Sequence, residues 1–170
     1  AAPVQLKSAG FGDMIAKYIG LADWQISFLL TGELYCEKVA SLTRTAVDEL
    51  MNMADKVCAE DEYTAGKIFE SLLKTGIGMS FMQNSRPASG SEHIIAHLIE
   101  CKELPEGKIP NLHGEDVGVC TLEMLKLYNT LAEKEKISAL RPAENWQEIF
   151  DFYGDMRHEV EKMNFPDNIT

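Results

Sequence analysis

The run NSRPASGSEHIIAH, residues 84–97, and the run NLHGEDVGV, residues 111–119, together hold three of the chain's four histidines. His93 and His97 are four residues apart, so on a helix they share one face and point toward one ligand. Prolines and a glycine in the intervening loop predict that one helix ends there and that another begins near His113. The pattern predicts a helix–loop–helix that carries three imidazoles.

Two interpretations of these histidines stay open at this point. Neutral imidazoles are common metal ligands, and a histidine at the start of a helix is a recurrent ligand position. Histidines at helical spacing are also common as hydrogen-bonded structural residues. Spacing alone does not separate the two interpretations, and under the first it would assign both His93 and His97 to the metal.

The composition is that of a globular protein, with 170 residues of which 45% are hydrophobic and 25% charged, enough for one sizeable domain. A net charge of -11 argues against nucleic acid as a partner, because its phosphates would be repelled. No stretch has the length and apolar character of a membrane span, and the start lacks the pattern of a signal peptide. Four scattered cysteines without a Cys-x-x-Cys pair are typical of reduced thiols in a core, so we expect a cytoplasmic protein.

The hydrophobic pattern predicts an all-α fold. Apolar residues recur at steps of three or four over residues 39–57, 88–102 and 114–132, whereas no segment shows the alternation of a strand. The helix over residues 88–102 should be buried nearly all round. The apolar segment 21–30, which ends at a Thr-Gly pair, is also predicted to be buried.

Asp13 is a candidate carboxylate near the start of the chain. Gly10 and Gly12 predict a break, and the residues that follow have helical composition, so Asp13 should lie in the first turn of a helix. A carboxylate at that position is explained by capping or by a functional site. The local sequence favours the capping role.

Three segments resemble a known family: SAGFGDMIAKY around Asp13, SRPASGSEHIIAH around His93, and LHGEDVGVCTL around His113. Together they resemble the C-terminal metal-binding domain of the iron-containing alcohol dehydrogenase superfamily, a multi-helix bundle of the dehydroquinate synthase-like fold. Within it they are most similar to the sn-glycerol-1-phosphate dehydrogenases, including the bacterial branch encoded with arabinose genes. The resemblance covers nearly the whole chain, and the string SRPASGSEH is specific to this branch.

The resemblance implies roles for individual residues. It implies that Asp13, His93 and His113 hold one divalent metal, which is zinc, nickel or iron, and that Asp13 and His97 are catalytic and contact the substrate. In the intact enzyme NADH or NADPH would deliver a hydride to dihydroxyacetone phosphate and give sn-glycerol 1-phosphate, with the reverse transfer to NAD or NADP; no residue here is assigned to that cofactor. We hypothesise that Arg86 binds the substrate phosphate, because a guanidinium fork suits phosphate; the alternative is a structural salt bridge.

From this resemblance we expect residues 1–170 to form a helical metal- and substrate-binding catalytic domain. The nucleotide-binding domain that precedes it in the family is expected to be absent, so the chain alone should be inactive without that partner. A homo-oligomer is also expected. Three alternatives stay open: a polyol oxidoreductase similar to glycerol dehydrogenase, a non-haem iron protein with Asp13, His93 and His113 as a facial triad, and a non-catalytic helical metal-binding module.

Overall fold

The computed structural model describes residues 3–59, 61–103, 107, 111–135 and 145–164. These residues form helices and connecting turns, with no strand among them, which confirms the all-α fold. The chain divides into two compact units, Ala1–Glu133 and Lys134–Thr170. In the second unit, α7 (Trp146–Tyr153) and α8 (Arg157–Asn164) are joined by a short 3₁₀ turn.

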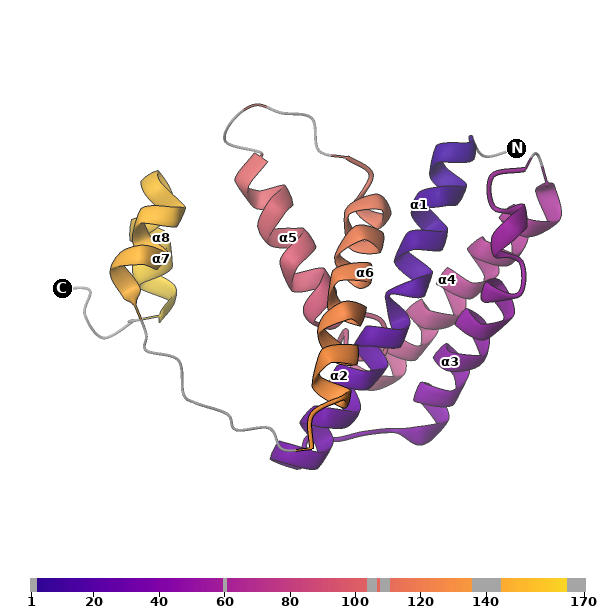
Figure 1. Ribbon diagram of the computed structural model, residues 1–170, viewed down its shortest axis with the longest axis horizontal. Coiled ribbons are helices and arrows are strands. Elements are labelled where there is room, and N and C mark those ends of the chain that lie inside the picture. Colours follow the sequence, from indigo (N-terminus) through magenta and orange to yellow (C-terminus); the bar gives the residue numbers. More distant parts are fainter. Residues whose placement is uncertain (1–2, 60, 104–106, 108–110, 136–144, 165–170) are drawn as a thin grey trace. The chain divides into compact units, whose positions relative to one another are not determined.

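The first unit is a bundle of six described helices in which α1 occupies the middle (Figure 1). Helix α1 packs against α6 on one side and α4 on the other; α3 lies along α4, and α5 lies along α6. The bounds are α1 Val4–Ile15, α2 Lys17–Thr31, α3 Glu37–Met51, α4 Glu62–Met82, α5 Ser91–Glu103 and α6 His113–Ala132. The prolines predicted to separate α5 from α6 lie outside the described residues.

The buried side chains of this unit form separate clusters of different character. Between α1, α3 and α4 the core is built from larger residues, among them Met14, Leu50 and Ile68. Where the chain passes from α1 to α2, the cluster is made of small side chains, with Ala16 against Ala96 of α5. Small side chains let backbones approach closely, so α5 and α6 come near the end of α1.

The backbones of α1 and α6 approach each other closely at glycine residues. A Cβ atom on Gly12 would collide with the backbone carbonyl oxygen of Gly114, and one on Gly118 would lie 3.1 Å from the Cα of Gly12. The prediction that Gly10 and Gly12 break the chain ahead of a helix is wrong, because both lie inside α1. Asp13 lies in the last turn of that helix rather than in the first turn of another.

Burial was overestimated for two helices. Helix α2 ends at Thr31 and is capped by Gly32 in a left-handed conformation (φ 74°), as the Thr-Gly pair predicted. Leu29 and Leu30 near its end, however, are 71% and 80% exposed. On α5, Ile94 is 71% exposed although the helix was expected to be buried all round. The hydrophobic pattern counts apolar residues but does not report whether another segment covers them.

The prediction of four core cysteines is also wrong in part. Cys120 is buried and Cys36 is half-buried, whereas Cys58 and Cys101 are exposed; all four are free thiols. Among the described residues, no helix combines the length and the apolar character needed to cross a membrane.

We predict that Gly12→Ala lowers the free energy of unfolding by about 1–3 kcal/mol, because the methyl group forces α1 and α6 apart. Gly76→Ala in α4 is the matched control, since its Cβ would meet nothing within 4 Å. It should stabilise the chain by about 0.5–1 kcal/mol through helix propensity. Urea unfolding of both variants measures the two free energies of unfolding. Changes of equal size and the same sign would contradict a close approach of α1 and α6 at Gly12.

Candidate metal centre

The bundle brings together the three histidines that the sequence separates. The ring centroids of His93 and His113 are 5.4 Å apart, and those of His97 and His113 are 5.1 Å apart with the rings stacked. His93 and His97 come from successive turns of α5, whereas His113 is the first residue of α6. The imidazoles therefore converge because α5 and α6 pack side by side.

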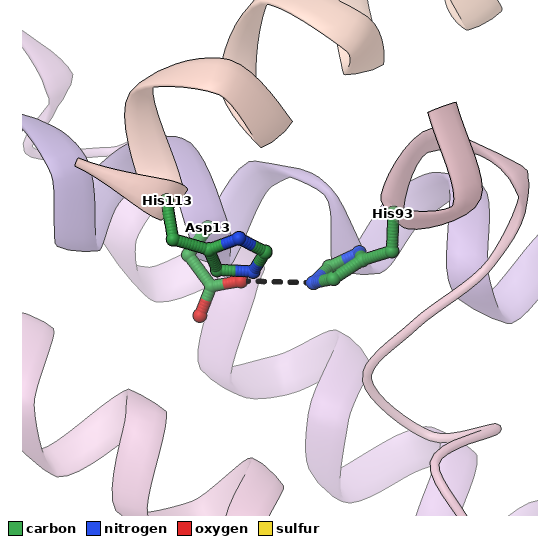
Figure 2. Close-up of side chains that lie close together, drawn as sticks. All are labelled: Asp13, His93 and His113. Atoms are coloured by element: carbon green, nitrogen blue, oxygen red, sulfur yellow. Dashed lines mark hydrogen bonds and ion pairs between the residues drawn. The ribbon is translucent and has the colours of Figure 1, made fainter. Parts of the chain in front are cut away.

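Asp13 joins His93 and His113 from the last turn of α1 (Figure 2). One ligand atom from each of the three residues lies within 4.8 Å of the other two, and His93 Nε2 is 3.2 Å from Asp13 Oδ1. Three different helices contribute one side chain each. One carboxylate and two imidazoles form a donor set that suits a divalent transition metal.

A second group of possible ligands shares His113. His97, Glu100 and His113 also place one ligand atom each within 4.8 Å. Here Glu100 binds both imidazoles, with Oε2 3.0 Å from His97 Nδ1 and Oε1 2.7 Å from His113 Nδ1. This outer group is more exposed, and the side chain of His97 is 59% exposed. It therefore faces solvent, while His93 faces the interior.

The electrostatics favour an ionised Asp13. Burial raises the pKa of Asp13, but the hydrogen bond with His93 and the positive charge of Lys17 outweigh burial and lower the pKa to about 2. Lys17 Nζ is 2.9 Å from Asp13 Oδ1, and its side chain is buried. Burial lowers the pKa of His93, yet its hydrogen bonds with Asp13 and Glu92 raise it overall. Asp13 is thus ionised at neutral pH.

Sequence reasoning missed three residues that contact this centre. Lys17 lies one helical turn beyond Asp13, and Glu100 lies three residues beyond His97, so helical spacing offered a signal for both. Glu92 precedes His93 directly, and its role shows only in the structure, where its side chain turns back into the protein.

Arg86 lies in the loop before α5, and its side chain pairs with Glu33 rather than with Asp13 or the three histidines. Its Nε donates to Glu33 Oε1 over 2.8 Å, and its backbone N–H donates to Asn84 Oδ1. Pro87 and Ala88, which follow, are buried. The structure therefore places Arg86 in an ion pair with Glu33, while Asp13 and the three histidines are gathered in one place.

The start of α5, on which His93 lies, is held by a carboxylate of α2. Asp23 accepts a hydrogen bond from the backbone N–H of Ser91 over 2.6 Å and another from the hydroxyl of Tyr128 on α6. Burial and the nearby Asp23 raise the pKa of Tyr128. Three helices are tied together at the point where α5 begins.

Tyr128→Phe should reduce the free energy of unfolding by about 1–2 kcal/mol, because it leaves a partly buried carboxylate without its hydroxyl donor. Tyr63→Phe is the matched control, because Tyr63 is 66% exposed, and it should change stability by less than about 0.5 kcal/mol. Thermal unfolding of both variants compares them. Equal stability of the two would show that the Tyr128–Asp23 bond does not hold α5.

No family model matches the chain. Curated proteins named glycerol-1-phosphate dehydrogenase (NAD(P)+) do match it. The protein of Bacillus licheniformis is 42% identical over 130 residues, covering 76% of this chain and 32% of the relative. That of Geobacillus stearothermophilus is 33% identical over 172 residues, covering 98% and 43%, and that of Methanosarcina acetivorans is 36% identical over 151 residues, covering 89% and 37%. The chain thus spans about a third to two fifths of the length of these relatives.

Proposed function

We propose, on the premise that this chain is homologous to glycerol-1-phosphate dehydrogenases over most of its length, that it is the helical metal- and substrate-binding part of such an enzyme. The observation that carries the proposal is the convergence of Asp13, His93 and His113 within 4.8 Å. The proposed reaction moves a hydride from NADH or NADPH to the carbonyl carbon of dihydroxyacetone phosphate and a proton to its oxygen. The products are sn-glycerol 1-phosphate and NAD(P)+.

The donor set fits one divalent ion of the zinc, nickel or iron type. Glu92 and Glu100 bind the Nδ1 atoms of His93 and His113, so the Nε2 atom of each ring is the one proposed to bind the ion. His93 Nε2 faces Asp13 Oδ1 at 3.2 Å, and the ion would replace the direct contact between these two atoms. Two neutral imidazoles and one carboxylate leave the ion with positive charge and open positions. When bound, it supplies Lewis-acid polarisation of the substrate carbonyl.

His97 is proposed to act on the substrate oxygen rather than on the ion. Its Nδ1 pairs with Glu100, and its ring is exposed and stacked on that of His113. The remaining Nε2 is a suitable donor for the oxygen that becomes a hydroxyl. Asp13 is proposed to hold a substrate hydroxyl with the carboxylate oxygen that does not face His93.

Arg86 is proposed to bind the substrate phosphate. The Glu33 ion pair uses Nε of the guanidinium, and the Nη amino groups are the other donors of the fork. The ion pair thereby orients the side chain and leaves a bidentate edge for phosphate. This assignment distinguishes a phosphorylated substrate from a simple polyol.

Neither binding of the nicotinamide cofactor nor self-association is assigned to particular residues of this chain. Because the chain spans 32% to 43% of the relatives' length, no residue is assigned to the nicotinamide cofactor. Self-association stays a prediction from the sequence, and gel filtration against mass standards tests it.

Elemental analysis tests the metal site. The chain, equilibrated with zinc, nickel or iron(II) and then desalted, should hold about one ion per chain, and His113→Ala should lose it, because one imidazole of the donor set is gone. His158→Ala is the matched control, since His158 is exposed on α8 in the other unit. An ion retained by His113→Ala, or absent from the unchanged chain, would refute the assignment.

Calorimetric binding of dihydroxyacetone phosphate to the metal-loaded chain tests Arg86. Arg86→Ala should weaken binding by about 10-fold or more, because a charge-assisted phosphate contact is lost. Glu33→Gln is the control: it breaks the ion pair but keeps the guanidinium, and it should retain most of the affinity. If Arg86→Ala binds dihydroxyacetone phosphate as tightly as the unchanged chain, the Arg86–Glu33 pair is only structural and the phosphate assignment fails.

A further inference from the structure

We propose that Glu92 is a positioning residue for the metal: it holds the imidazole of His93 by Nδ1 and so presents Nε2 to the ion. This inference rests on the proposed metal site and extends it to a residue outside the donor set. Glu92 contacts neither the substrate nor the ion in this assignment. It acts through His93.

Both hydrogen bonds of the Glu92 side chain are accepted by the same oxygen, Oε1. Its Oε1 is 2.6 Å from His93 Nδ1 and also accepts the backbone N–H of Gly90 over 2.9 Å. The residue is fully buried, with 0% of its surface exposed. The other oxygen, Oε2, is buried without a hydrogen-bond partner among the described residues.

A buried carboxylate with one oxygen unsatisfied is costly unless positive charge lies nearby. The imidazole of His93 is the group that can supply it, because a cation on Nε2 polarises the ring and its Nδ1–H. A metal ion shared by His93 and Asp13 would therefore balance the charge of Glu92 from the opposite side of the ring. In return, the carboxylate fixes the tautomer and raises the basicity of the ligand atom.

A simpler role for Glu92 is that of a helix cap. It lies in the first turn of α5, and its bond to the N–H of Gly90 is the reach-back contact of a capping residue. Such a role predicts a change in stability and no change in metal affinity. The two roles are separable because Glu92→Gln keeps an oxygen that can accept both hydrogen bonds and removes only the charge.

The experiment measures the zinc dissociation constant by competition with a chromogenic chelator, for the unchanged chain, Glu92→Gln and Glu92→Ala. We expect zinc binding to weaken by about 10-fold in Glu92→Gln and by about 100-fold in Glu92→Ala, the range found for partners of metal-bound histidines. Glu123→Gln is the matched control, because Glu123 is an exposed residue of α6 paired with Lys126, and its zinc affinity should be unchanged. The rise in Tm on adding zinc should shrink in the same order.

The possible results separate a positioning role of Glu92 from a capping role. Unchanged zinc affinity in Glu92→Gln would overturn the proposal and leave Glu92 as a cap, a role that would lower the Tm of metal-free Glu92→Ala but not that of Glu92→Gln. If Glu92→Ala does not fold, Glu92→Gln still decides, because it keeps the cap. If the unchanged chain binds none of zinc, nickel and iron(II), the metal site itself fails, and this inference fails with it; that result is distinct from a site that binds zinc equally well without the Glu92 charge.

Discussion

The contact between the backbones of α1 and α6 is the constraint on which the centre depends. Gly12 meets Gly114 with no room for a Cβ between them. Asp13 follows the first glycine directly, and His113 precedes the second. Each of these two proposed ligands is therefore adjacent in sequence to the point where the helices touch. A Cβ on Gly12 or Gly114 would push the two helices apart. The short distance between the Asp13 carboxylate and the His113 imidazole therefore depends on glycine at both positions.

The two proposed metal histidines are oriented in the same way but in different surroundings. Each has Nδ1 bound by a carboxylate, His93 by Glu92 and His113 by Glu100. Glu92 is fully buried, whereas Glu100 faces the solvent side and also binds His97. One imidazole is thus held rigidly from the interior. His113 shares Glu100 with His97, the residue proposed to act on substrate. The proposed ligand and the proposed proton donor are therefore linked through one carboxylate.

The sequence predicted most of the helices, because their apolar periodicity is a local property. It was wrong over residues 39–57, where one helix was predicted but α3 ends at Met51 and a separate 3₁₀ turn follows. Helix α6 and the end of α2 at Gly32 follow the predicted pattern. The role of Gly12 could not be predicted in the same way, because a glycine in a single sequence indicates a break as readily as a close approach. What distinguishes the two is the helix on the other side of the contact, which is a tertiary property. The exposure of Ile94 was missed for the same reason.

The candidate site was predictable in its residue types and less so in its grouping. Spacing alone paired His93 with His97, whereas the structure places Asp13 beside His93 and gives His97 a partner in Glu100. Asp13 is 80 residues away from His93 in sequence, and helical spacing carries no information over that distance. Only the resemblance to a family supplied this pairing before the structure did. Glu92 gave no signal because a glutamate beside a histidine is common on exposed helices.

The most direct test of the central claim is anomalous diffraction at the zinc absorption edge from crystals of the chain grown with zinc. We predict one peak bounded by Asp13, His93 Nε2 and His113. A peak among His97, Glu100 and His113 instead would show that the outer group is the metal site. Full diffraction from well-ordered crystals with no peak at either place would contradict a metal centre in this bundle.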